Sequence, residues 1–172
     1  MKHNKLEMTR KLCPGCGCTL DQIDGPTHAY MYSTPACWKI FNNLLAAEYE
    51  SAALMEVHHL SVDAYAVQHP GNGSRQAIQS VGLHLARLAM QYENPHPLEK
   101  TKKAMQHFAN RKETLIELDP PKSFTMTIAD VAPFTGKTLH ADKVKLWARS
   151  TWNDWQAHHA YILDWISGGE SR

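Results

Sequence analysis

The stretch STPACWKIFNNLLAAEY, residues 33–49, predicts the first helix and with it the helical character of the chain. Thr34 can cap this helix with its side-chain oxygen, and Pro35 suits the first helical position, where a backbone N–H has no intrahelical partner. Apolar residues then recur mostly at spacings of three and four from Trp38 onward, which is the period of an amphipathic helix. We therefore expect this helix to continue to about Leu54.

Outward from this helix, the chain carries further helical patterns and few strand signals. The residue before Pro70 is pushed out of the α region, and Gly168 can end the last helix. We expect helices over residues 57–68, 75–94, 98–110 and 141–167, and a short capped helix that starts at 127–130. The predicted fold class is all-α, a four- or five-helix bundle with an irregular N-terminal zinc-knuckle segment. We expect a single helical domain over residues 1–172, with 13–37 as the zinc-binding segment and 1–12 as an irregular leader.

Length and composition set limits on the function. The 172 residues carry 18 Lys and Arg against 17 Asp and Glu, and the formal net charge of +1 argues against binding nucleic acid by bulk electrostatics. No run of about 18 apolar residues occurs, so we expect no membrane-spanning segment. Residues 1–11 are polar and basic without an apolar signal segment, which favours the cytoplasm. In that reducing compartment a structural disulfide is not expected.

The most specific chemical signal is CPGCG at residues 13–17. Two thiolates separated by two residues can bind one ion from a tight turn, in which proline fixes its φ and the glycines permit a positive φ. A tetrahedral zinc site needs two more ligands, and the nearest are His28 and Cys37, in the pattern Cys-x2-Cys-x11-His-x8-Cys. Cys18 competes for a place, although a single residue separates it from Cys16. The predicted zinc ligands are Cys13, Cys16, His28 and Cys37.

Other uses of the cysteines stay open. A redox Cys-x2-Cys usually begins a helix after a strand, and the turn-rich surroundings of Cys16 oppose that use. Rubredoxin-type iron would use the same turn, normally with four sulfur ligands. Cys37 lies in the first turn of the predicted helix, where the helix dipole and free N–H groups lower a thiol pKa. This position suits a metal-bound thiolate or, equally, a reactive cysteine.

Histidines on the predicted helices form a second set of candidates. His84 falls on the apolar stripe of its helix, His159 lies on the apolar face of the last helix, and Asp63 is an acidic partner for a buried imidazole. Side chains of this kind from separate helices can build a metal site in a bundle, and a divalent ion with an open position would activate water. A lone buried histidine is, however, more often a core residue with one hydrogen-bonded nitrogen. The candidate catalytic group, with a second divalent metal ion as its cofactor, is His58, Asp63, His69, His84 and His159. The histidines expected in solvent or in loops are His3, His96, His107 and His140.

Several stretches together resemble a family of uncharacterised bacterial proteins, a domain of unknown function. They are CPGCG at 13–17, GPTHAY at 25–30, STPACW at 33–38, VDAYAVQHPG at 62–71, QSVGLH at 79–84 and WQAHH at 155–159. The resemblance implies that His28 and Cys37 join the two knuckle cysteines. It also singles out the helix residues named above and the pair His158–His159. The family name carries no activity.

A weaker similarity is to DinB-like proteins, helical bundles that hold a metal ion through three histidines. Such proteins usually show His-x3-His on the last helix, whereas Asp154 and Trp155 stand four residues before His158 and His159 here. The similarity implies a metal-binding helical bundle that departs from the usual histidine pattern.

Two classes of function compete. The first is a metal-dependent hydrolase or transferase that acts on a small molecule, because a bound ion lowers the pKa of its water. The alternative is a non-catalytic, metal-stabilised binding or interaction module. A nucleic-acid partner is not favoured, because Glu99 and Glu113 border the one basic tract, and such a run is usually a solvated helix face. That tract is Lys100, Lys102, Lys103, Arg111 and Lys112.

Overall fold

The computed structural model describes residues 9–93, 95 and 98–168. It begins with an antiparallel hairpin of β1 (Arg10–Leu12) and β2 (Thr19–Asp21), in which Lys11 pairs with Leu20. The helices are α1 (Pro35–Tyr49), α2 (Ala52–Met55), α3 (His58–Gln68), α4 (Arg75–Tyr92), α5 (Leu98–Arg111), α6 (Ile128–Val131), α7 (His140–Asp154) and α8 (His159–Ser167). Short 3₁₀ turns follow α5 (Lys112–Thr114), α6 (Ala132–Phe134) and α7 (Gln156–His158). The described chain is mostly helical, as the sequence predicts.

Side-chain caps begin several of these helices at the predicted places. The hydroxyl of Thr34 accepts a hydrogen bond from the N–H of Cys37 at 3.3 Å, and Ser74 caps α4 in the same way. The first helix ends at Tyr49, earlier than expected, because Ser51 caps the separate helix α2. The helix starts can therefore be predicted better than the helix ends.

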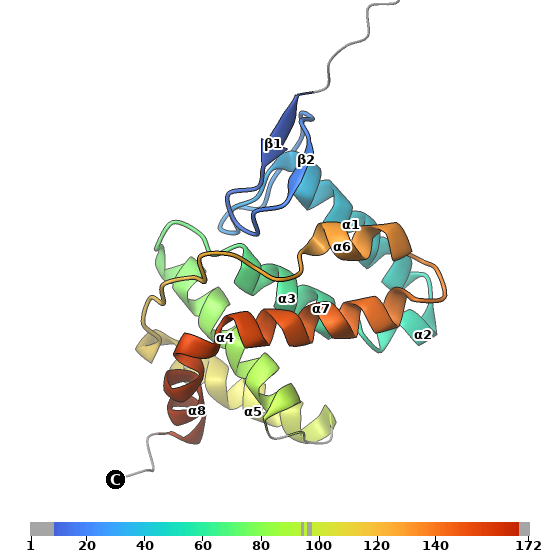
Figure 1. The fold of residues 1–172 in the computed structure, drawn as a ribbon. Coiled ribbons are helices and arrows are strands. Elements are labelled where there is room, and N and C mark those ends of the chain that lie inside the picture. Colours follow the sequence, from blue (N-terminus) through green and yellow to red (C-terminus); the bar gives the residue numbers. More distant parts are fainter. Residues whose placement is uncertain (1–8, 94, 96–97, 169–172) are drawn as a thin grey trace, which may run out of the picture.

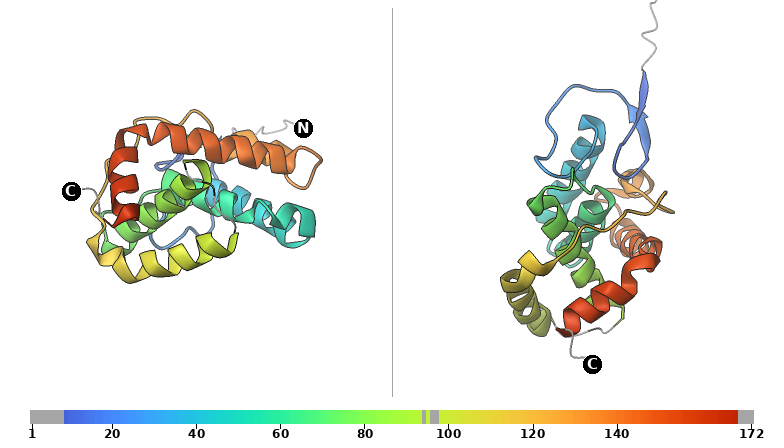
Figure 2. Two further views of the ribbon diagram at one scale, coloured as in Figure 1. Left: turned by 90° about the horizontal axis from the view of Figure 1, so that it is seen from below. Right: turned by 90° about the vertical axis from the view of Figure 1, so that its left-hand side faces the viewer.

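Helix α3 packs against both α4 and α7, and eight of its eleven residues are buried (Figures 1 and 2). Its last residue, Gln68, donates to the carbonyl of Met126 at 2.7 Å and to the hydroxyl of Thr151 at 2.9 Å, and it accepts from the indole of Trp147 at 3.1 Å. A buried amide needs such partners, and here they fasten α3 to α7. None of the helices in the described ranges combines the length and the apolar character that a bilayer crossing requires.

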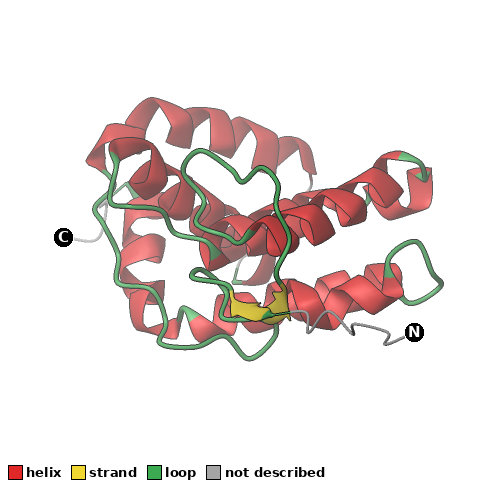
Figure 3. Cartoon of the chain, turned by 90° about the horizontal axis from the view of Figure 1, so that it is seen from above, coloured by secondary structure: helices red, strands yellow, loops and turns green. Residues whose placement is uncertain are grey.

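The hairpin lies beyond α1, at the end of the molecule opposite to α5 and α8 (Figure 1). Seen from the hairpin side, long loops run across the helices (Figure 3). Residues 10–12 had been expected in an irregular leader but form β1, and residues 13–18 are the turn that joins the strands. Both strands are short and largely exposed, so they lack the alternation of apolar and polar residues that identifies a half-buried strand.

The long helix predicted over 141–167 is two helices, α7 and α8. The carboxylate of Asp154 at the end of α7 accepts hydrogen bonds from the N–H and the hydroxyl of Thr125, at 2.9 and 2.7 Å. The ring of His159 stacks on Trp152 at 3.7 Å and donates to its carbonyl at 2.8 Å. The same carbonyl accepts from the N–H of Trp155 at 3.1 Å, so the side-chain contacts of Asp154 and His159 add to the backbone bond at the point where the helix is interrupted. As a result α8 turns and packs against α4.

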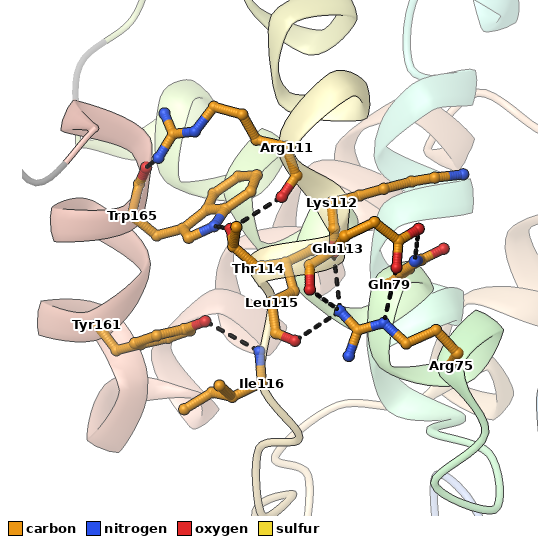
Figure 4. Close-up of polar contacts among 10 residues, drawn as sticks. All are labelled: Arg75, Gln79, Arg111, Lys112, Glu113, Thr114, Leu115, Ile116, Tyr161 and Trp165. Carbon is orange, nitrogen blue, oxygen red and sulfur yellow. Dashed lines mark hydrogen bonds and ion pairs between the residues drawn. The ribbon is translucent and has the colours of Figure 1, made fainter.

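Arg75, the first residue of α4, holds the end of α5 (Figure 4). Its Nη2 donates to the carbonyl oxygens of Lys112, Glu113 and Leu115 at 3.0, 2.8 and 2.8 Å. Its Nε also lies 3.3 Å from the carboxylate of Glu113. Carbonyl groups near a helix end have no partner within the helix, so Arg75 serves as their cap from another element.

Trp165 fastens α8 to the same turn (Figure 4). Its indole N–H donates to the hydroxyl of Thr114 at 2.7 Å. The guanidinium of Arg111 lies over its ring, 5.1 Å from the centroid, and donates to its carbonyl at 3.0 Å. Nearby, the hydroxyl of Tyr161 accepts from the N–H of Ile116 at 3.1 Å. The turn after α5 is thus bonded to both α4 and α8.

Replacing Arg75 by methionine is expected to lower the free energy of unfolding by about 2 kcal/mol, because three carbonyl groups lose a charged donor. Arg75→Lys should lose most of the same amount, since an ammonium group does not reproduce the planar guanidinium. Chemical denaturation followed by circular dichroism measures the change, with Lys122→Met at an exposed loop position as the control. A loss for Arg75→Met no larger than the control's would contradict this assignment.

Candidate metal centre

Four side chains from three parts of the chain converge where the hairpin meets the helices. The sulfur atoms of Cys13, Cys16 and Cys37 and one ring nitrogen of His69 all lie within 4.8 Å of one another, and all four residues are buried. Within residues 9–93, 95 and 98–168 this is the one group of three or more His, Cys, Asp or Glu side chains that is close enough to share an ion. We call it the Cys3His cluster.

The turn between β1 and β2 positions two of the sulfur atoms. The N–H of Cys13 donates to the carbonyl of Cys18 at 2.8 Å, and the N–H of Gly17 donates to the carbonyl of Cys13 at 3.0 Å. Gly17 has a φ of 77°, a left-handed conformation that glycine adopts without a steric penalty. This closed turn brings the thiols of Cys13 and Cys16 to one position.

Two helix ends position the other donors. Cys37 is the third residue of α1, and its N–H is bonded to the cap Thr34, so its sulfur lies at the end of the helix that favours negative charge. His69 directly follows α3 with φ −126° and ψ 57°. It leaves the helical conformation because Pro70 comes next. The cluster therefore ties the hairpin to α1 and α3.

The spacing of the donor atoms fits a tetrahedral ion. The sulfur atoms of Cys16 and Cys37 are 3.8 Å apart, and the sulfur of Cys37 lies 3.3 Å from Nε2 of His69. At usual zinc bond lengths, a tetrahedral ion separates two sulfur ligands by about 3.8 Å and a sulfur from a nitrogen by about 3.6 Å. Shifts of about a few tenths of an ångström would bring these atoms to that geometry.

The surrounding residues orient the donors. Nδ1 of His69 lies 2.7 Å from the carbonyl oxygen of Tyr65, which can only accept, so Nδ1 carries the proton and Nε2 presents a lone pair to the sulfur atoms. The hydroxyl of Tyr65 donates to the sulfur of Cys37 at 3.6 Å. The ring of Tyr65 stacks between Phe41 and His69, with centroids 3.8 Å away on each side. Burial raises the pKa of Tyr65, which keeps the phenol protonated as a donor.

Without an ion, the four donors share protons. Hydrogen bonds from the thiols of Cys16 and Cys18 lower the pKa of Cys13, whereas the hydrogen bond to Cys13 raises the pKa of Cys16 and that of Cys37. Burial lowers the pKa of His69, but hydrogen bonds to Cys13 and Cys16 outweigh burial and raise it to about 9. A metal ion must displace these protons, because thiolates and neutral imidazole are the ligand forms. Metal affinity is therefore expected to fall as the pH falls.

The fourth donor differs from the sequence prediction. His28 is half-buried and lies outside the cluster: its Nδ1 accepts from the N–H of Tyr30 at 3.3 Å, and its ring contacts Tyr30 and Trp38. His69 takes the fourth position, which the sequence had predicted for His28. The spacing rule favoured the nearer histidine along the chain. The signal for His69 was its position before Pro70, where the end of a helix can present an imidazole to another element.

Cys18 is buried beside the Cys3His cluster but is not a member of it. Its thiol lowers the pKa of Cys13 and raises that of Cys16. The sequence predicts that Cys18 is a poor ligand, because a single residue separates it from Cys16. Its backbone instead closes the turn, since its carbonyl accepts a hydrogen bond from the N–H of Cys13.

The candidate catalytic histidines do not meet at one place. His69 belongs to the Cys3His cluster. His159 stacks on Trp152 in the connection between α7 and α8. His58 lies at the start of α3, and its Nδ1 is 2.8 Å from the carboxylate of Glu48 instead. The five residues therefore do not form the second metal site that the sequence suggested.

Glu48 is the centre of a buried network that sequence reasoning missed. Its carboxylate accepts from His58 at 2.8 Å, from the hydroxyl of Ser61 at 2.5 Å and from His140 at 3.1 Å. His140 had been expected in solvent or a loop, yet its side chain is fully buried. Glu48 continues the buried face of α1 that Cys37, Phe41 and Leu44 form, and its polar partners lie on α3 and α7, which the sequence of α1 alone does not indicate. The network joins α1, α3 and α7.

Asp63 and His84 do form a pair, between α3 and α4. Oδ1 of Asp63 lies 2.7 Å from Nδ1 of His84 and 3.1 Å from the guanidinium of Arg87, while its buried Oδ2 has no hydrogen-bond partner among the described residues. The side chain of Asp63 is 1% exposed and that of His84 is 24% exposed. The carboxylate thus orients an imidazole whose other nitrogen is open to solvent.

The remaining predicted histidines are scattered. His107 is exposed, as expected, and His158 is bonded to the carbonyl of Asp119 at 2.8 Å. His3 and His96 lie outside the described residues.

Gly15 lies between the two knuckle cysteines and packs directly on α3. A Cβ at this position would clash with the ring of His69, with the carbonyl of Tyr32 and with the carbonyl of Gln68. A Cβ on Gly17 would meet nothing within 4 Å and would carry only the penalty of a positive φ. The close approach of the knuckle to His69 therefore requires glycine at position 15.

Gly15→Ala is accordingly expected to lower the free energy of unfolding of the metal-loaded protein by about 3 kcal/mol and to weaken metal binding at least about tenfold. The control Gly17→Ala should cost about 1 kcal/mol and retain the metal. Denaturation curves and competition with a chromogenic chelator measure both quantities. Equal effects of the two substitutions would be incompatible with the packing of the knuckle on His69.

Fold and cluster together define a mostly helical protein with a three-cysteine, one-histidine candidate metal site beneath its amino-terminal hairpin. The sequence profile of a family of unknown function, DUF5946, matches residues 11–156, so the chain belongs to this family. The matched range includes all four cluster residues and the Asp63–His84 pair, and it ends before α8. No curated protein and no solved structure matches the chain. The resemblance to an uncharacterised family is confirmed, and the similarity to DinB-like proteins stays a prediction.

Proposed function

We propose that the Cys3His cluster binds one zinc ion and that this ion is structural. The main support for this proposal is that the protein supplies four buried donor side chains, of which Cys37 and His69 are fully inaccessible to solvent. Structural zinc sites have four protein ligands, whereas catalytic ones keep a position for water or substrate. Three thiolates and one imidazole are a common zinc set, while rubredoxin-type iron would normally take four sulfurs.

The ion would fasten the hairpin to α1 and α3. The segment from β1 to the start of α1 is rich in turns and exposed residues, and it offers little apolar surface with which to fold alone. Free energy of metal binding would take the place of a core there, as in other small metal-bound segments. We infer that the protein is a metal-stabilised binding module of the cytoplasm, whose ligand or partner is recognised away from the ion.

A chelator titration tests this proposal. One zinc ion per chain is expected by elemental analysis of tag-free protein, and its removal should cause one cooperative loss of structure in the hairpin region. The metal content of His84→Ala should equal that of the original protein, because His84 lies outside the cluster. A second, labile ion per chain that His84→Ala loses would overturn the non-catalytic assignment.

A second candidate function is hydrolysis or group transfer by the Asp63–His84 pair. Its support is the geometry of a buried carboxylate that holds Nδ1 of an imidazole and leaves Nε2 facing solvent, with Arg87 beside it as a cation for an anionic substrate group. Turnover of a p-nitrophenyl ester should then fall at least about a hundredfold in His84→Ala. The exposed control His107→Ala should leave it unchanged. Equal rates in all three proteins would remove this candidate.

A further inference from the structure

A groove lies between α4, α5 and α8, at the end of the molecule away from the hairpin. Figure 2 (right) shows α5 and α8 on either side of α4 there. The groove is open on one side, has a volume of about 630 Å³ and is lined by apolar side chains from all three helices. They are Ala89, Met90, Ala104, Phe108, Leu163 and Ile166. This volume lies within the range of small-molecule sites, about 300–1,000 Å³.

Short side chains keep the groove open. Ala89 on α4 and Ala104 on α5 face it, and neither fills the space between the helices. One of its walls is fixed, because Phe108 packs on Trp165 with ring centroids 5.3 Å apart. Leu163 is 40% exposed, an apolar side chain left partly in water. A ligand that covered Leu163 would gain the free energy of its burial.

The rim of the groove is cationic. Lys100, Lys103 and His107, all exposed and all on α5, line it together with Ser167, and none of the acidic side chains in the described part of the chain does. Glu99, the acidic residue of this helix, pairs with Lys102 at 3.3 Å. The basic tract of α5 thus borders an apolar surface. This apolar surface does not favour a nucleic-acid partner, because the nucleic-acid backbone is charged throughout.

We propose that this groove binds a free fatty carboxylate of medium chain length. The acyl chain would lie along the apolar floor, and the carboxylate would face Lys100 and Lys103. This inference is independent of the zinc ion and of the Asp63–His84 pair. The amino groups of the two lysines distinguish this ligand from an uncharged amphiphile of the same length, and the size of the groove suits a single acyl chain.

The test compares three head groups on one chain: decanoate, decanol and decyltrimethylammonium, each titrated below its micelle concentration by calorimetry and by backbone NMR shifts. Decanoate is expected to bind once per chain, with shifts confined to α4, α5 and α8. Decanol should bind about tenfold more weakly, since two exposed ion pairs of moderate strength are lost. The cationic amphiphile should bind more weakly still. Each CH₂ added from hexanoate to decanoate should tighten binding up to about fourfold.

Matched variants distinguish binding in the groove from nonspecific electrostatic or hydrophobic binding elsewhere on the protein. Lys100→Gln with Lys103→Gln should reduce decanoate binding to the level of decanol, while Lys39→Gln with Lys122→Gln, both exposed and outside the groove, should not. Leu163→Glu should abolish binding, and Leu146→Glu, exposed on α7, should not. Equal affinity for the three head groups would overturn the proposal, as would equal loss in the control variants. Binding only to phosphatidylglycerol vesicles or to duplex DNA would also overturn it.

Discussion

Cys37→Ser protein is expected to purify without zinc and to unfold at a temperature at least about 10 °C below that of the original protein. Cys37 supplies a thiolate at the amino end of α1 and lies within bonding range of both Cys16 and His69. Structural zinc contributes about 10–16 kcal/mol of apparent binding free energy in small metal-dependent folds, so losing one ligand removes a large part of the stability of the hairpin region. Elemental analysis and thermal unfolding measure the two effects.

The controls for this result are chosen from the same region. Cys18→Ser should keep one zinc ion and nearly the original melting temperature, because Cys18 is buried beside the cluster without belonging to it. His69→Ala should behave like Cys37→Ser, and His28→Ala like Cys18→Ser. If His28→Ala lost the metal and His69→Ala kept it, the ligand set drawn from the structure would be wrong and the one from sequence spacing right.

Glu48→Ala is expected to lower the free energy of unfolding by about 3–5 kcal/mol. The carboxylate is fully buried and bonded to His58, Ser61 and His140, so its removal leaves three polar groups without their acceptor. Glu48→Gln keeps the shape of the side chain and one acceptor oxygen, and it should recover part of the loss. Urea denaturation of each variant gives these free energies.

Glu50→Ala is the matched control, because Glu50 is two residues away on the same helix end and is exposed. It should change the free energy of unfolding by no more than about 0.5 kcal/mol. Glu48→Ala and Glu50→Ala of similar stability would mean that the network does not join α1, α3 and α7 in the way described above. Zinc content should stay the same in both variants, which separates this network from the metal site.

The helices could largely be predicted from the sequence because caps and breakers are local signals. Thr34 and Ser74 mark helix starts whatever the rest of the chain does. The hairpin could not be predicted, since its six strand residues are too exposed to show a periodic pattern. The break between α7 and α8 also escaped prediction, because it depends on Asp154 meeting Thr125, 29 residues away along the chain.

The same distinction applies to the metal site. Three donors follow from local spacing: Cys13 and Cys16 in the knuckle and Cys37 at the start of a helix. His69 is 32 residues beyond Cys37, and it joins the cluster because α3 packs beneath the knuckle at Gly15. Chain spacing carries no information about that packing, so the nearer His28 was favoured. A histidine just before a proline at a helix end is the feature that would have drawn attention to His69.

The most direct test of the central claim is X-ray absorption spectroscopy at the zinc edge of the purified, tag-free protein. Three sulfur neighbours at about 2.3 Å and one nitrogen neighbour at about 2.0–2.1 Å are predicted, in a four-coordinate shell without water. Four sulfur neighbours would place Cys18 in the shell instead of His69. A light-atom neighbour that remains in His69→Ala protein, or a shell that includes water, would contradict the closed Cys3His site.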